Sequence, residues 1–126
     1  MSNSKNALSG YAAAAAPVRT DRGAEYAAFA RVTSSLKAVD ESDKSAFPAL
    51  AEAVFVNQRL WAILSQDLRE DGNSLPMDLR VQLLSLADFV QKHSKAVLRG
   101  RESIEPLIDI NTSIMRGLRG SVEVAA

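Results

Sequence analysis

Apolar residues recur at steps of three and four along most of this chain, the spacing that places them on one face of an α-helix. The first clear stripe lies between residues 20 and 39. Thr20 or Asp21 can accept a hydrogen bond at its start, as N-cap residues do. The cluster at residues 40–44 is polar and indicates a connection. The stripe of this predicted helix is formed by Tyr26, Phe29, Val32, Leu36 and Val39.

Two longer stripes predict helices over residues 47–71 and 76–99. Gly72 and Gly100 follow them, at the position where a left-handed glycine ends many helices. Pro76 suits the first turn of the second helix, because that position needs no backbone N–H. The first stripe comprises Leu50, Val54, Asn57, Trp61, Leu64 and Leu68, and the second comprises Leu79, Leu83, Leu86, Val90 and Val97.

The two ends of the chain are less regular. Residues 8–16 are rich in alanine, the strongest helix former, and predict a short helix that Pro17 ends. Ser103 can cap a last helix. We expect residues 1–6 and 121–126 to be loose. The apolar stripe of the last helix, together with Asn111, comprises Ile104, Leu107, Ile108, Asn111, Ile114, Met115 and Leu118.

The chain shows neither an alternating strand pattern nor a hairpin turn. Its connections are short, so successive helices should pack as antiparallel neighbours. We therefore predict an all-α fold in which residues 1–126 form a single domain, a small bundle of about four to five antiparallel helices.

Composition narrows the function. The chain has 126 residues and a mass of 13.6 kDa, enough for one hydrophobic core. It has no cysteine, which excludes disulfides and thiolate chemistry, and a single histidine, His93. Its 15 basic residues balance 15 acidic ones, so its net charge does not favour binding to a polyanion. These features predict a protein that is not an enzyme and binds no cofactor or metal.

No apolar stretch approaches the length of a membrane-spanning helix, so we expect no membrane insertion. Residues 5–16 faintly resemble an export signal, but alanine is weakly hydrophobic and the segment has only Lys5 as a positive charge. The expected location is the cytoplasm, in keeping with the absence of cysteine.

Residues 67–78 invite comparison with a calcium-binding helix–loop–helix. Arg69, however, falls at a ligand position, and Asp78 stands where the bidentate glutamate belongs. An ordinary turn explains the segment better. His93 lies on an apolar stripe, and we expect it at the edge of the core with one ring nitrogen hydrogen-bonded.

A basic stripe on the fourth predicted helix consists of Lys92, Lys95 and Arg99. It suggests contact with RNA. Without interleaved aromatic residues or a known binding motif, a solvated helix face is the favoured interpretation.

Two asparagines, Asn57 and Asn111, lie on apolar stripes. A buried amide costs stability unless it is hydrogen-bonded, so each should have a defined partner. The favoured interpretation is a structural network that fixes the register of the helices. The alternative is a pair of polar anchors for the backbone of a bound helix.

The apolar surface is generous for so few helices, because Phe47, Phe55, Val56, Phe89 and Met115 fall beside or opposite the main stripes. Either an amphipathic partner helix or self-association into a homodimer would cover this surplus. The predicted partner-binding residues are Trp61, Leu64, Leu68, Ile114, Met115 and Leu118.

Several of these segments together resemble the flagellar biosynthesis regulator family FlaF. The resemblance rests on AVFVNQRLW at residues 53–61, NSLPMDLR at 73–80, SLADFV at 85–90, and LIDIN at 107–111 followed by Gly117 and Leu118. It covers roughly residues 11–120. The order and spacing of Asn-x-x-Leu-Trp, Leu-Pro-x-x-Leu-Arg and Ile-Asn are more specific than any one motif.

The resemblance implies a small helical cytoplasmic protein that acts in flagellin production, opposite the translational repressor FlbT, and as a flagellin-specific secretion chaperone. It also implies a ligand, because flagellin has amphipathic terminal helices whose apolar faces are exposed before assembly. We therefore expect binding to flagellin that promotes its synthesis and export. The alternative is control of flagellin translation through FlbT or through flagellin mRNA contacted by Lys92, Lys95 and Arg99.

Overall fold

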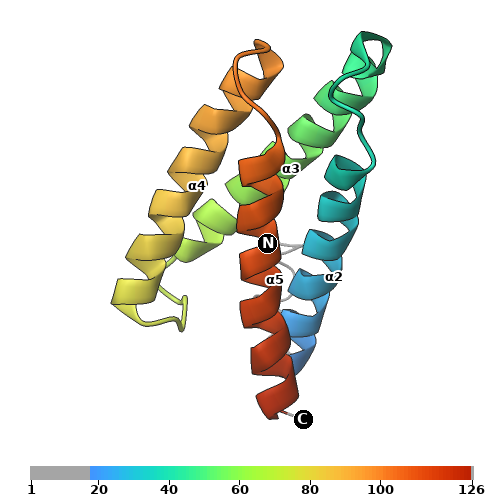
Figure 1. The fold of residues 1–126 in the computed structure, drawn as a ribbon. Helices are drawn as coiled ribbons and strands as arrows, with labels where there is room; N and C mark the ends of the chain where they lie inside the picture. Colours follow the sequence, from blue (N-terminus) through green and yellow to red (C-terminus); the bar gives the residue numbers. More distant parts are fainter. Residues whose placement is uncertain (1–17, 126) are drawn as a thin grey trace.

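The computed structural model describes residues 18–125, in which four α-helices and one short 3-10 helix follow one another (Figure 1). They are α2 (Val18–Lys37), η1 (Lys44–Ala46), α3 (Phe47–Leu68), α4 (Met77–Leu98) and α5 (Glu105–Ala125). This part of the chain contains no strand, so the predicted all-α class is confirmed. The helix predicted over residues 8–16 lies outside the described residues.

The helices form two antiparallel pairs. α5 runs beside α2, and α4 returns along α3, which crosses behind α5 on a diagonal (Figure 1). α4 and α5 meet at far fewer positions than either pair. The core fills the crossing region, where Phe29 of α2 meets Trp61 of α3 edge to face, with ring centroids 5.6 Å apart. The predicted apolar stripes thus face one common interior.

Side chains from the following turn and from α4 close the C-terminal end of α3. Asn73 donates from Nδ2 to the Asp67 carbonyl oxygen at 3.2 Å, and Arg80 donates from Nε to the Leu68 carbonyl oxygen at 2.9 Å. Arg80 also donates from Nη2 to the Glu70 carbonyl oxygen at 3.1 Å. The last carbonyls of a helix have no partner within it, so these bonds replace what another turn would supply.

The glycine predicted to end α3 has a different role. α3 ends at Leu68, before the predicted boundary at Asp71, and Gly72 does not adopt the left-handed conformation. Capping by side chains makes that conformation unnecessary here. Gly100 does adopt it after α4, with φ of 75°, as predicted.

Two other predicted boundaries are wrong. The structure describes α2 from Val18 onward, so Thr20 and Asp21 lie inside the helix and not before its first residue. At the other end, α5 continues to Ala125, so residues 121–125, which we expected to be loose, are helical.

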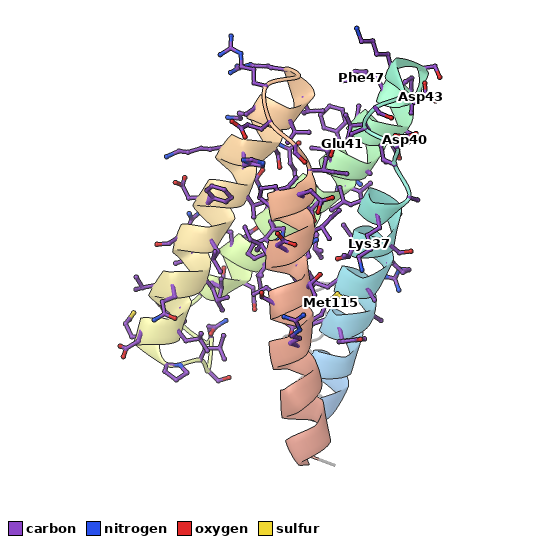
Figure 2. The ribbon with its side chains drawn as sticks, viewed as in Figure 1. Lys37, Asp40, Glu41, Asp43, Phe47 and Met115 are labelled. Carbon is purple, nitrogen blue, oxygen red and sulfur yellow. The ribbon has the colours of Figure 1, made fainter. Side chains whose placement is uncertain are left out.

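A carboxylate from a distant loop stabilises the start of α5 by hydrogen bonding. Glu41, in the connection after α2, accepts hydrogen bonds from the Ile104 backbone N–H at 3.0 Å and from the Ser103 hydroxyl at 2.9 Å. Ser103 Oγ accepts in turn from the Glu105 backbone N–H at 3.0 Å, which confirms its predicted capping role. Figure 2 labels Glu41 with its loop neighbours at this end of the bundle. A carboxylate is favoured there because the start of a helix is electropositive.

The same connection is ordered by two local turns. The Ser42 side-chain and backbone groups donate to Asp40, and those of Ser45 donate to Asp43. These bonds lower the pKa of each aspartate below its ordinary value of 3.8, because they favour the charged form. These hydrogen bonds therefore stabilise the loop conformation in which Glu41 reaches the start of α5.

Replacing Glu41 should weaken the attachment of the loop to α5. We expect Glu41→Ala to lower the free energy of unfolding by about 1 kcal/mol, as the loss of an N-cap partner does. Glu52→Ala is the control, because Glu52 is an exposed residue on α3. Urea unfolding followed by circular dichroism measures both. Equal effects would contradict the capping role of Glu41.

Candidate functional site

A chain of three buried polar side chains joins α3 to α5. Trp61 donates from its indole Nε1 to Asn111 Oδ1 at 2.9 Å, and Asn111 donates from Nδ2 to Asn57 Oδ1 at 2.8 Å. All three side chains are completely buried. The two asparagines thus have each other as partners, as the predicted structural network requires.

One end of this chain has unused hydrogen-bonding capacity. The Nδ2 group of Asn57 has no hydrogen-bond partner, and neither has the buried hydroxyl of Thr33 on α2. Buried polar atoms without partners cost free energy relative to their exposure to water. Two buried polar groups, one on α2 and one on α3, are therefore left unsatisfied.

The structure places half of the predicted partner-binding residues in the core. Trp61 and Leu68 have no exposed surface, and Leu64 is 7% exposed. A partner could not touch these side chains without opening the bundle. Figure 2 shows Met115 on the side of α5 that faces α2, and Ile114, Met115 and Leu118 are all half-buried. These α5 residues remain accessible in part.

A strip of incompletely covered apolar side chains lies where α4 and α5 diverge. Leu79 and Phe89 of α4 are 39% and 44% exposed, while the other members are half-buried. All of these positions are uncharged, so the strip itself offers no partner for an ion pair. We call it the α4–α5 strip and define it as Leu79, Leu83, Leu86, Phe89, Ile110 and Ile114.

Helix register places the members of each half of this strip on one side of their own helix. The strip residues of α4 are spaced by four, three and three residues, so they share one side of the helix. His93 follows four residues after Phe89 and lies on the same side. His93 stacks on Phe89 with centroids 5.2 Å apart, and its Nε2 lies 2.8 Å from the Ser103 carbonyl oxygen just before α5. Ile110 and Ile114 follow Ser103 by two and three helical turns.

The environment of His93 agrees with its prediction. The ring is half-buried and one nitrogen is hydrogen-bonded, so the residue lies at the edge of the core. It joins α4 to the start of α5 at the end where these helices meet. The strip begins one turn away, at Phe89.

The sequence pattern identified part of this surface. Phe89 was expected outside the main stripes, and its exposure confirms this. Leu79 was expected inside, since it continues the buried stripe of α4 by one more turn. It is 39% exposed and lies in the first turn of α4, at the end where α4 and α5 lie apart (Figure 1). The periodicity of the sequence does not determine the spacing between α4 and α5, so it could not predict the exposure of Leu79.

The basic residues on α4 share one face, as the spacing predicted. Lys92, Lys95 and Arg99 are exposed, and Lys92 Nζ lies 2.9 Å from Asp88 Oδ2. Asp88 is on the same face and offsets part of its charge. RNA contact at this face stays a prediction.

Two kinds of feature are absent from residues 18–125. None of the described helices is long and apolar enough to cross a membrane. No group of three or more histidine, aspartate or glutamate side chains is arranged there to hold a metal ion.

The asparagine pair should be energetically coupled. Asn111→Ala leaves Trp61 Nε1 and Asn57 without their partner, and we expect it to lower the free energy of unfolding by about 2–4 kcal/mol. In a double-mutant cycle, Asn57→Ala should cost less in the Asn111→Ala background, by about 1 kcal/mol. Urea unfolding monitored by the fluorescence of Trp61, the only tryptophan, measures each variant.

Thr112→Ala is the control for this cycle, because the Thr112 hydroxyl bonds only to the Ile108 carbonyl oxygen of its own helix at 2.7 Å. We expect it to cost less than about 1 kcal/mol. Strict additivity of the two asparagine substitutions would show that the buried bond does not couple α3 to α5.

Comparison with known proteins identifies the family. No curated protein and no solved structure shows significant similarity to the chain. The family model for flagellar protein FlaF matches residues 7–118. That span includes the buried polar chain, the residues that close α3 and the α4–α5 strip. The chain therefore belongs to the FlaF family of flagellar proteins.

Proposed function

We propose that this protein is a non-enzymatic flagellum biogenesis factor that binds flagellin as a secretion chaperone and thereby promotes flagellin synthesis and export. Membership of the FlaF family supports the link to the flagellum. The observation that supports the binding role is the α4–α5 strip, an uncharged apolar surface that the bundle leaves partly exposed. Flagellin, in its amphipathic terminal helices, offers a ligand of matching chemistry.

The strip suits one face of a helix. Its α4 members extend over three turns, the length over which an amphipathic helix presents a row of apolar anchors. Each leucine or phenylalanine that becomes fully buried contributes at most about 1.5–3 kcal/mol, so the apolar face of the partner helix has to contribute as well before binding outweighs the cost of association. A covered flagellin helix could not coil with another subunit prematurely, and the absence of ion pairs would permit release at export.

Substitutions on opposite sides of α4 test this role. Leu79→Asp and Phe89→Asp place a charge in the strip and should weaken binding to monomeric flagellin at least about tenfold, because a charge opposes apolar burial. Val81→Asp is the matched control. Val81 is 53% exposed but lies two residues after Leu79, on the far side of the helix, and its change should leave affinity within about twofold.

Calorimetric titration measures these affinities, with a flagellin truncation that lacks the terminal helices as a second ligand. The truncated flagellin should not bind. Thermal unfolding of each variant shows that the bundle is intact. Normal binding by Leu79→Asp and Phe89→Asp would exclude the strip as the flagellin site, and absence of binding by the unmodified protein would shift the proposal to a FlbT-type partner or flagellin mRNA.

A further inference from the structure

We infer that a second copy of this chain docks on the side of the α3–α4 pair that is turned away from α5, with α3 of each copy lying on α4 of the other. We call this surface the outer face and define it by Phe55, Arg59 and Ala62 of α3 and Val81, Leu84 and Asp88 of α4. It lies apart from the α4–α5 strip, so the inference does not depend on flagellin binding.

Helix register places the outer face on the opposite flank of α4 from the strip. Val81, Leu84 and Asp88 follow one another at steps of three and four, and a further step of three reaches Gln91. Gln91 donates from Nε2 to the Gln58 carbonyl oxygen at 2.9 Å, so this flank of α4 borders α3. Between the two flanks runs the buried row of α4, which consists of Ala87, Val90, Ser94 and Val97.

α3 turns a corresponding side outward. Phe55, Arg59 and Ala62 are exposed, and their spacing of four and three residues places them on one side of the helix. Asn57 and Trp61, which take part in the hydrogen bonds to α5, lie toward the interior. α5 lies in front of α3 in Figure 1, so the outer face is turned away from the viewer there.

The most exposed large apolar side chains of residues 24–118 lie on this side of the pair. Met77 is 64% exposed, Phe55 is 54% exposed and Val81 is 53% exposed. Met77 precedes Val81 by four residues, about one helical turn, and so shares its side of α4. Exposed apolar side chains gathered on one face mark an interaction surface.

The alignment of the two helices sets which residues of the face lie at the same level. It follows from two hydrogen bonds, Gln91 to Gln58 and Arg80 to Leu68. By this alignment Asp88 of α4 lies near the level of Arg59 of α3, and Leu84 lies near the level of Ala62. Opposite charges therefore share one level, and a large and a small apolar side chain share the next.

This pattern makes the face complementary to itself. A two-fold axis parallel to the helices lays α3 of one copy on α4 of the other and keeps every level unchanged. Arg59 then faces Asp88 of the second copy, and Ala62 leaves room for its Leu84. Within residues 18–125 no ion pair is recorded for Arg59, while Asp88 pairs with Lys92 of its own helix. The contacts occur twice by symmetry, and none of them opposes like charges.

The size of the face also agrees with a dimer. α3 and α4 have 22 residues each, so each helix is about 33 Å long and about 10 Å wide. Side by side they offer about 600–700 Å² per copy. Stable interfaces bury about 600–1,000 Å² per partner, and the outer face reaches this range.

Sedimentation equilibrium of the full-length chain tests the inference. We expect the mass to rise with concentration from 13.6 kDa toward twice that value. Phe55→Asp and Val81→Asp should each raise the dissociation constant of the dimer at least about tenfold, because a charge opposes apolar burial. Phe89→Asp is the matched control, since Phe89 lies in the strip, and should change the constant less than about twofold. Circular dichroism of each variant verifies the fold.

A charge exchange tests the arrangement of the two copies. Arg59→Glu and Asp88→Arg should each weaken the dimer about threefold or more, because each places like charges opposite one another. The double variant restores opposite charges at both symmetric positions, so its dissociation constant should return to within about twofold of the original. A double variant that dimerises no better than Arg59→Glu alone would contradict the arrangement.

Two further outcomes would overturn the inference. A mass of one chain at every concentration would exclude a second copy and leave the outer face to a different protein. Loss of the dimer in Phe89→Asp, with Phe55→Asp unaffected, would identify the strip as the interface instead. Because these measurements use the protein alone, their result is independent of whether flagellin binds.

The dimer leaves both strips uncovered. Phe55→Asp should therefore change the affinity for monomeric flagellin less than about twofold while it weakens the dimer. Normal dimerisation without any flagellin binding would contradict the proposed function and support this inference.

Discussion

The hydrogen bonds made by Asn111 are the constraint on which the arrangement of the helices depends. Its amide accepts from Trp61 and donates to Asn57, so one side chain of α5 fixes two successive turns of α3. Apolar contacts alone would tolerate a shift of one helix along another, whereas a shift here would leave three buried polar groups without partners. The position of α3 along α5 is therefore fixed at this point.

Other residues of the FlaF pattern have similar roles. Asn73 and Arg80 close the end of α3, and Asn57 and Trp61 belong to the buried chain. The most specific part of the sequence therefore specifies how the helices begin, end and align. The α4–α5 strip is made of leucine, isoleucine and phenylalanine, which occur throughout any helical core. A motif search therefore finds the fold of this protein far more readily than it finds the α4–α5 strip.

The sequence predicted the helices because each buries one stripe, and it predicted the partnership of the asparagines because an amide on such a stripe needs a bond. It failed where an outcome depended on distant residues. The end of α3 is set by Arg80 from the next helix, and the start of α5 is reinforced by Glu41 from a remote loop. The exposure of Leu79 depends on how far α5 lies from α4. The pattern predicted partner binding by Trp61, Leu64 and Leu68, although the same periodicity also places these residues in the core.

The two buried groups without partners bear on how the bundle moves. An opening that admits water beside Thr33 of α2 or the Asn57 amide of α3 gives that group a hydrogen bond that it lacks in the closed bundle. Each hydrogen bond gained in this way offsets about 1–3 kcal/mol of the cost of that opening. Local openings that reach either group are therefore favoured over openings of equal extent elsewhere, and amide hydrogen exchange would proceed through them before the rest of the fold gives way.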